Sequence, residues 1–340
     1  MIPVSVITGF LGSGKTTLLG RLLRHPDMSR TAVIMNEFGE IGLDHELVET
    51  SDESFIRLSN GCLCCNVRSD LTLTLGDLAA RRAAGTVPPF ERVVIETTGL
   101  ADPAPILHAL MTDRGLAEVY ALDGVVTTVD ALTGLATLDR HQESLRQAAV
   151  ADRIVLTKTD VDGADTAAIT QRLAGVNPGA PIVDGAQSEI APSVLFDAGL
   201  YSATGKTLDV QRWLADEAVA AAGGHTHRHH RDDIASFSLV RAEPVHAATL
   251  ALFLSALAEN CGPDLLRMKG IVRVVEDPER PAAIHGVQHV YHAPVWLERW
   301  PSGDRRTRMV FIGRNIPESW VTSLLELLES EVAEETARRI

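Results

Sequence analysis

The first two hundred residues alternate between short runs of apolar residues and longer segments in which apolar residues recur every three or four positions. Apolar runs of this length predict buried strands, and the longer period predicts helices packed on them. We expect strands at residues 2–8, 31–35, 55–58, 92–95, 120–129, 153–156 and 181–183, and helices at 17–23, 66–84, 103–111, 142–149 and 165–174. Such alternation indicates an α/β domain with a mostly parallel sheet that is covered on both faces.

The pattern changes after residue 200, where an alanine run gives way to a stretch rich in glycine, histidine and arginine. We interpret residues 201–233 as a linker. Beyond it, we expect strands at 234–240, 266–275, 282–290, 293–299 and 307–312, and helices at 245–259 and 317–329. The chain is therefore predicted to consist of an α/β domain over 1–200, the linker, and a small α+β domain with an antiparallel sheet over 234–335.

A glycine-rich segment, Gly-Phe-Leu-Gly-Ser-Gly-Lys-Thr-Thr, joins the first strand to the first helix. Glycines let the backbone fold tightly around a phosphate, and the helix N-terminus favours negative charge there. Lys15 can then reach the β- and γ-phosphates, and the Thr16 hydroxyl can bind Mg²⁺. The segment has the spacing of a phosphate-binding loop and predicts a nucleoside triphosphatase. Its candidate nucleotide contacts are Gly12, Ser13, Gly14, Lys15, Thr16 and Thr17.

The strand predicted at 92–95 leads into Glu96, which is followed by Thr97, Thr98 and Gly99. A carboxylate at the carboxyl end of such a strand can hold Mg²⁺ and its waters, and the Gly99 N–H can contact the γ-phosphate. Aspartate is more usual than glutamate at this position. We assign Glu96, with Lys15, to the hydrolytic machinery.

The strand predicted at 153–156 leads into Thr157, Lys158, Thr159 and Asp160. The Asp160 carboxylate can accept hydrogen bonds from N1 and the exocyclic amine of guanine, a pair that adenine lacks. The aliphatic stem of Lys158 can cover the face of the base. These residues predict GTP as the nucleotide, with Thr157 standing where asparagine is more common.

Cys62, Cys64 and Cys65 lie within four positions, directly before a predicted helix. Thiols at a helix N-terminus ionise readily, and thiolates bind soft metals such as zinc or cobalt. A closed structural site normally uses separated cysteine pairs, so this triplet is better suited to reversible loading. The alternative is three buried, structural cysteines.

Two further segments carry candidate ligands. Residues 36–44 lie where a switch segment would respond to the γ-phosphate, so Glu37, Glu40 and Asp44 are candidates for nucleotide sensing, water activation or metal ligation. A solvated acidic loop is the competing interpretation. In the linker, His225, His227, His229 and His230 form either a weak metal-collecting site or a merely polar tract.

Charge and composition exclude several classes. A net charge of −14 disfavours nonspecific binding to nucleic acid or to an anionic membrane. No signal peptide is visible, and the most apolar stretch, residues 247–258, is too short to span a bilayer. Four cysteines in 340 residues do not resemble a disulfide framework. We expect a soluble, cytoplasmic protein.

Taken together, the phosphate loop, Asn-Glu-Phe-Gly-Glu at 36–40, Gly-Cys-Leu-Cys-Cys at 61–65, Glu-Thr-Thr-Gly at 96–99 and Thr-Lys-Thr-Asp at 157–160 resemble the CobW family of P-loop GTPases. The resemblance implies a cytoplasmic metallochaperone, most often for zinc and sometimes for cobalt or iron, that couples GTP hydrolysis to delivery into a client protein. It also implies that Cys62, Cys64 and Cys65 form the metal site. The family often has an acidic residue where this chain has Met35, so Glu40 becomes the better candidate for an oxygen ligand.

Two other functions are compatible with these residues. One is a metal-responsive regulatory GTPase that binds clients without transferring metal. The other is a small-molecule kinase, which Asp160 disfavours because it selects a base, and for which no acceptor site is evident. The sequence names neither the physiological metal, nor the client, nor the oligomeric state.

Overall fold

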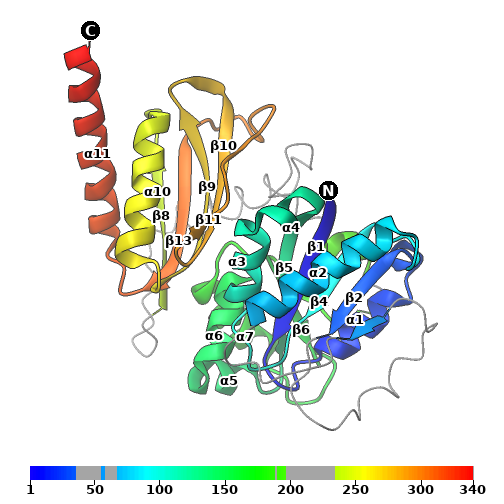
Figure 1. The fold of residues 1–340 in the computed structure, drawn as a ribbon. Coiled ribbons are helices and arrows are strands. Elements are labelled where there is room, and N and C mark those ends of the chain that lie inside the picture. Colours follow the sequence, from blue (N-terminus) through cyan, green and yellow to red (C-terminus); the bar gives the residue numbers. More distant parts are fainter. Residues whose placement is uncertain (36–54, 58–66, 188–189, 197–233, 340) are drawn as a thin grey trace. The chain divides into compact units, whose positions relative to one another are not determined.

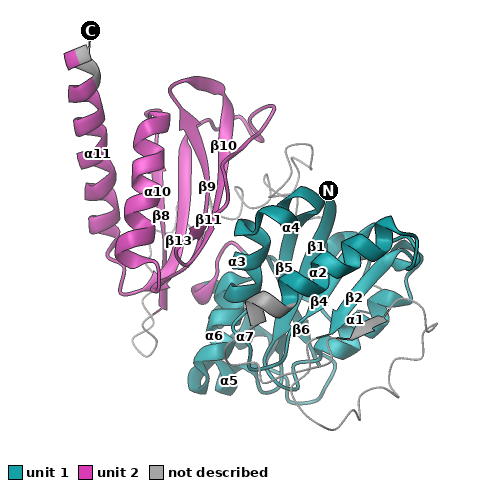
Figure 2. Ribbon diagram, viewed as in Figure 1, with its two compact units in different colours: residues 1–174, 180–199 teal, residues 175–179, 200–340 magenta. Residues whose placement is uncertain are grey.

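The computed structural model describes residues 1–35, 55–57, 67–187, 190–196 and 234–339 (Figure 1). The chain divides into two compact units, residues 1–174 with 180–199 and residues 175–179 with 200–340 (Figure 2). Each unit is built around a sheet of its own. This arrangement confirms the predicted fold class, an α/β domain followed by a small α+β domain.

The first unit contains a seven-stranded sheet in the order β3-β2-β4-β1-β5-β6-β7, and every strand pairing in it is parallel. Its strands are β1 (Ile2–Gly9), β2 (Thr31–Met35), β3 (Phe55–Arg57), β4 (Arg92–Glu96), β5 (Tyr120–Asp130), β6 (Arg153–Thr157) and β7 (Ile182–Asp184). The helices described before residue 196 are α1 (Lys15–Leu23), the short 3-10 helix η1 (Pro26–Met28), α2 (Val67–Ala83), α3 (Ala104–Thr112), α4 (Arg114–Val119), α5 (Gly134–Arg140), α6 (Gln142–Val150), α7 (Thr166–Val176) and α8 (Pro192–Leu195).

The central strand, β1, is buried along almost its whole length, as expected for a parallel strand covered on both faces. On one face, Leu18, Leu19 and Leu22 of α1 pack against Ile7 of β1 and Val94 of β4. Burying a leucine side chain contributes about 1.5–3 kcal/mol, so this contact fixes the first turn of α1 against the end of β1.

The strand order brings distant parts of the chain to one edge. β1 lies between β4 and β5, with Ile7 opposite Glu96 and Gly9 opposite Thr128. β6 follows β5, with Asp130 opposite Thr157. Because all these strands are parallel, the loops that follow their carboxyl ends lie along the same edge of the sheet.

The second unit is an antiparallel sheet in the order β11-β10-β9-β13-β8, with β12 paired to β10. Phe311 stacks on Phe237, with ring centroids 5.0 Å apart, and meets the edge of Phe253 from α10. Val321 and Leu325 of α11 join the same core. The elements are β8 (Ile234–Arg241), α10 (Ala247–Cys261), β9 (Leu265–Val274), β10 (Asp277–Val287), β11 (Val290–Tyr291), β12 (Val295–Trp296), β13 (Thr307–Arg314) and α11 (Glu318–Arg339).

Some predicted elements differ from the structure. The strand expected at 282–290 is wrong at its end, because Gln288 has a φ of 53° and turns the chain between β10 and β11. The strand expected at 293–299 is reduced to the two residues of β12. The final helix continues ten residues past the predicted end at 329, to Arg339. The short helices α4, α5 and α8 were not predicted, because six, seven or four residues carry too few apolar repeats to reveal a helical period.

Candidate nucleotide site

The loop between β1 and α1 is the predicted phosphate loop. Gly12 and Gly14 have φ values of 72° and 87°, in the left-handed region that glycine adopts without strain. The Ser13 N–H donates to the Phe10 carbonyl at 3.1 Å, and the Ser13 hydroxyl lies 2.6 Å from the hydroxyl of Thr128 on β5. The loop therefore makes the tight turn that the motif requires and is anchored to the neighbouring strand.

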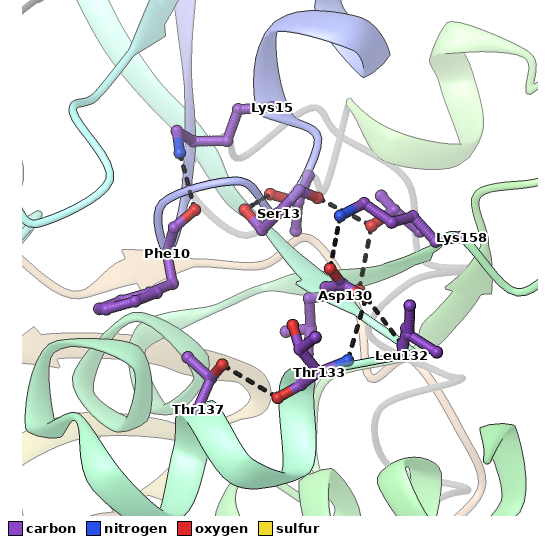
Figure 3. Close-up of polar contacts among 11 residues, drawn as sticks. Phe10, Ser13, Lys15, Asp130, Leu132, Thr133, Thr137 and Lys158 are labelled. Atoms are coloured by element: carbon purple, nitrogen blue, oxygen red, sulfur yellow. Dashed lines mark hydrogen bonds and ion pairs between the residues drawn. The ribbon is translucent and has the colours of Figure 1, made fainter. Parts of the chain in front are cut away.

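The side chain of Lys15 turns back into this loop. Its ammonium donates hydrogen bonds to the carbonyls of Gly9 at 2.9 Å and Phe10 at 3.0 Å, the second of which is drawn in Figure 3. Burial lowers the pKa of the Lys15 ammonium, and the carboxylate of Glu96 opposes that shift. The cation is thus held at the mouth of the loop, near the place where phosphate oxygens would neutralise it.

Thr16 and Glu96 are brought together by the pairing of β1 with β4. The Thr16 hydroxyl donates to Oε1 of Glu96 at 2.7 Å, and the Glu96 side chain is buried. A carboxylate and a hydroxyl at this separation form the kind of hard oxygen donor set that Mg²⁺ prefers. These two residues therefore fit a magnesium ion. Thr17, the next residue, lies exposed in the first turn of α1.

Gly99 lies against the phosphate loop. A Cβ atom at this position would come within 2.6 Å of the backbone nitrogen of Leu11, so no larger residue fits without a shift of the backbone. The loop after β4 therefore packs directly against the backbone of the phosphate loop.

The residues predicted to read the base follow β6. The Thr157 hydroxyl donates to the Ser13 carbonyl at 2.8 Å, and a Cβ on Gly14 would lie 3.3 Å from the Thr157 methyl group. The threonine that stands in place of the usual asparagine is therefore part of the support for the phosphate loop. Asp160 lies exposed three residues further on.

Lys158 forms an ion pair that the sequence analysis missed. Its backbone is left-handed, with a φ of 57°, and its ammonium lies 2.6 Å from Oδ2 of Asp130 at the end of β5 (Figure 3). The other carboxylate oxygen accepts the N–H groups of Leu132 at 2.7 Å and Thr133 at 3.2 Å. The signal was present: Asp130 ends an apolar strand as Glu96 does.

The Asp130 carboxylate is held in its charged form. Partial burial opposes ionisation, but the hydrogen bond from Lys158, those from the N–H groups of Leu132 and Thr133, and the Lys158 charge outweigh it and keep the pKa of Asp130 below its usual range. The ion pair therefore fixes the direction of the Lys158 stem, which is the part predicted to cover the base.

The loop after β7 joins the same edge. The Thr159 hydroxyl donates to Asp184, which also accepts the N–H of Ala186 at 3.0 Å. Arg21 of α1 donates to the carbonyl of Gly185 at 2.5 Å and to that of Gln187. Helix α1 and the segment predicted to read the base, through Thr159, are therefore both hydrogen-bonded to residues 184–187.

The remaining predicted site residues lie outside the described residues. They are Glu37, Glu40, Asp44, Cys62, Cys64, Cys65, His225, His227, His229 and His230. Among the residues that are described, no group of three or more His, Cys, Asp or Glu side chains is placed to hold a metal ion. None of the helices in the described ranges has the length and apolar character needed to cross a membrane.

Residues 3–184, more than half of the chain, match the CobW/HypB/UreG nucleotide-binding domain family. The chain belongs to the CobW family of P-loop GTPases. Residues 234–328 match the second domain of such proteins, the cobalamin synthesis protein CobW C-terminal domain. This assignment confirms the resemblance drawn from the motifs and the prediction of a P-loop GTPase.

Three relatives align with nearly the whole length of this chain. The zinc chaperone YjiA of Escherichia coli is 34% identical, with 93% of this chain and 95% of YjiA aligned. The zinc chaperone CobW of Sinorhizobium sp. is 31% identical, with 92% of each protein aligned. A zinc-regulated GTPase metalloprotein activator of Dictyostelium discoideum is 27% identical over 97% of this chain and 79% of its own length.

Solved structures of YjiA resemble this chain as well. The crystal structure of Zn(II)-bound YjiA from E. coli has a TM-score of 0.68 and 29% identity, covering 96% of this chain and 98% of YjiA. A Zn(II)-bound triple mutant of YjiA, in which one glutamate and two cysteines are replaced by alanine, has a TM-score of 0.69. The fold of this chain is therefore similar to that of the YjiA GTPase along almost its full length.

Proposed function

We propose that this protein is a metallochaperone that binds GTP with Mg²⁺, hydrolyses the GTP, and thereby controls the delivery of zinc to a client metalloprotein. The observation that carries the proposal is the convergence of Lys15, Thr16 and Glu96 at one edge of the sheet in a chain whose full-length relatives are named zinc chaperones. Its thiols would remain reduced in the cytoplasm, where we propose that it acts.

In this proposal, Lys15 neutralises the β- and γ-phosphates, and Gly12, Ser13 and Gly14 surround them with backbone N–H groups. Thr16 and Glu96 hold Mg²⁺, which when bound supplies positive charge to the phosphate oxygens. The 2.7 Å hydrogen bond between the two side chains supports that assignment, because it holds a hydroxyl oxygen and a carboxylate oxygen next to each other. Glu37 and Asp44 are the candidates for orienting the attacking water, and Gly99 for contacting the γ-phosphate.

Selectivity for guanine rests on Asp160, which accepts two hydrogen bonds that adenine cannot donate. The anchoring of Lys158 by Asp130 supports this role, since it holds the stem that would lie along the base. Thr157 contributes indirectly, through its hydrogen bond to Ser13.

Zinc is the cargo in this proposal, with cobalt as the alternative metal. We assign it to Cys62, Cys64 and Cys65, with Glu40 as the candidate fourth ligand. The segment at 36–44 would respond to GTP and connects the phosphate loop to the triplet by a short stretch of chain. A coupling of roughly 1–3 kcal/mol between nucleotide and metal would change zinc affinity by about 5–150-fold, enough to convert a holding site into a donating one.

A second candidate is a regulatory GTPase that senses zinc without transferring it. The name of the Dictyostelium relative, zinc-regulated GTPase metalloprotein activator, fits regulation by zinc as well as activation of a metalloprotein client. The two functions differ in one measurable respect: a chaperone loses its zinc to the client, whereas a regulator keeps it.

The experiment loads the protein with zinc and mixes it with a zinc enzyme stripped of its metal, in the presence of a chelator that removes free zinc. The chaperone proposal expects recovery of enzyme activity with GTP and little recovery with a non-hydrolysable analogue. Equal recovery with both nucleotides would show that hydrolysis does not control delivery. Nucleotide-dependent binding of the enzyme without loss of zinc would favour the regulatory switch.

The cysteine assignment needs a readout that is specific for thiolate, because YjiA is zinc-bound even in the variant that lacks two cysteines. We expect Co²⁺ to give sulfur-to-cobalt charge-transfer absorption in the unaltered protein. Replacing Cys64 and Cys65 by alanine should remove that band and leave GTP binding unchanged. A variant lacking His225, His227, His229 and His230 should retain the band; its loss there would show that the histidine tract completes the tight site.

A further inference from the structure

Gln147 is a fully buried polar residue of α6 that nothing in the nucleotide site described above uses. Its side-chain amide donates hydrogen bonds to the carbonyl of Gly99 at 3.2 Å and to the carbonyl of Ala101 at 3.0 Å. A buried glutamine that donates both amide hydrogens to two carbonyls of one loop fixes the position of that loop. Breaking either hydrogen bond would leave a buried polar group without a partner.

The helix that carries Gln147 is itself fixed to the sheet. The Thr127 hydroxyl, buried on β5, donates to the backbone carbonyl of Gln147 at 2.8 Å. At the start of the same helix, the ring of His141 stacks on Phe10 of the phosphate loop, with centroids 4.5 Å apart. Helix α6 therefore contacts both the phosphate loop and the loop that follows β4.

The segment from Gly99 to Ala101 is held from two sides. Gln147 binds its carbonyls, and on the other side Gly99 lies against the backbone of Leu11. One residue further on, Asp102 accepts the first N–H of α3, from Ala104, at 2.9 Å, and its other oxygen lies 3.5 Å from Arg146. The position of the Gly99 peptide is thus determined by α6 rather than by the loop's own backbone alone.

We infer that Gln147 is a positioning residue that holds the Gly99–Ala101 segment against the phosphate loop, in the place where the Gly99 N–H meets the γ-phosphate, and so sets the discrimination between GTP and GDP. The inference rests on the proposed function, in which Gly99 contacts the γ-phosphate. GDP has no γ-phosphate, so its binding does not depend on this segment. Displacing the segment would weaken only the contacts made to GTP and to its transition state.

The test replaces Gln147 with methionine, which has a similar shape but no amide, and separately with glutamate, whose oxygens would face the two carbonyls. Gln142→Met is the matched control, since Gln142 lies exposed on the same helix. Binding of a fluorescent GDP and of a non-hydrolysable GTP analogue is measured, together with kcat and KM for GTP. Both Gln147 variants should lose about tenfold or more in analogue affinity and in kcat, because two neutral hydrogen bonds are removed. GDP affinity should stay within about threefold of that of the unaltered protein.

A purely structural role would lower the affinities for GDP and the analogue equally and would also lower the unfolding temperature. That outcome, or unchanged discrimination in both Gln147 variants, overturns the inference. If the unaltered protein itself binds the analogue no differently from GDP, the γ-phosphate contact of the proposed function is what fails. Hydrogen exchange on the unaltered protein provides a measurement that does not depend on the variants folding. The Ala101 amide, which donates to the Thr98 carbonyl at 3.1 Å inside the held segment, should exchange slowly before nucleotide is added. Exchange of that amide at the rate of an unstructured chain would show that Gln147 does not hold the segment.

Discussion

The hydroxyl of Thr16 donates a 2.7 Å hydrogen bond to the buried carboxylate of Glu96, joining α1 to the end of β4 across 80 positions of sequence. The contact exists because β4 pairs with β1 in parallel, with Ile7 opposite Glu96. It places a hydroxyl oxygen and a carboxylate oxygen side by side at the start of α1, next to the phosphate loop.

Glu96→Gln should keep the shape of this pair and remove its negative charge. We expect kcat for GTP to fall on the order of 100-fold, because the charge that holds Mg²⁺ beside the phosphates is lost. The concentration of Mg²⁺ needed for half-maximal hydrolysis should rise. The measurement is a Mg²⁺ titration of steady-state GTP hydrolysis, with Glu91→Gln, an exposed glutamate just before β4, as the control. An unaltered Mg²⁺ requirement in Glu96→Gln would remove Glu96 from the magnesium site.

Lys15→Ala and Asp160→Ala should affect different steps. Without the Lys15 ammonium, hydrolysis should be abolished with any nucleotide, since the phosphates lose their buried counter-charge. Without the Asp160 carboxylate, the preference for GTP over ATP should shrink on the order of 10- to 100-fold, because hydrogen bonds to a charged acceptor are lost.

Steady-state hydrolysis of GTP and of ATP checks Lys15→Ala, and competition binding of the two nucleotides checks Asp160→Ala. Asp162→Ala, an exposed aspartate in the same loop, is the control. If Asp160→Ala still discriminates as the unaltered protein does, the base is read by other residues.

The ion pair between Lys158 and Asp130 should make stability depend on pH. The pKa of Asp130 lies below its ordinary value of 3.8 in the folded protein, so the folded state favours the charged form. Its contribution to the free energy of unfolding is therefore fully present above pH 3.8 and is lost as the pH falls through the folded pKa.

Asp130→Asn should consequently be less stable than the unaltered protein at pH 7, and the difference should close on acidification below about pH 4. Urea unfolding of both proteins between pH 7 and pH 3 measures this. The same comparison with Asp162→Asn should show a much smaller difference. A gap between Asp130→Asn and the unaltered protein that is constant over the whole range would mean that the carboxylate charge does not stabilise the loop.

Gly99→Ala should destabilise the protein and slow hydrolysis, because the new methyl group would lie 2.6 Å from the backbone nitrogen of Leu11. Overpacking of this kind costs about 1–3 kcal/mol. Gly76→Ala is the matched control. A Cβ there meets nothing within 4 Å on α2, and alanine should stabilise the helix by roughly 0.5–1 kcal/mol. The unfolding temperature should fall for Gly99→Ala and rise for Gly76→Ala. If Gly99→Ala unfolds at the temperature of the unaltered protein and hydrolyses GTP at the same rate, the Leu11 backbone shifts at little cost.

The sequence determined the features of this protein that are built from neighbouring residues. The phosphate loop could be predicted because its glycines, its lysine and its flanking strand and helix lie within about twenty positions, and left-handed φ values at Gly12 and Gly14 are a local property. The alternation of apolar periods predicted the parallel sheet for a similar reason, since burial on both faces of a strand leaves a continuous apolar run.

Only the tertiary structure decided which strand ends lie side by side. β4 and β5 flank β1, an order that differs from the order along the chain, so periodicity alone could not pair Thr16 with Glu96. Lys158 and Asp130 follow consecutive strands, but only the structure shows that their side chains meet. Gln147 was least visible of all, because one polar residue in an amphipathic helix is ordinarily solvated, and only packing against the β4–α3 loop makes it a buried donor. The chemical nature of each side chain follows from the sequence, but its partner depends on which strands and helices pack together in the tertiary structure.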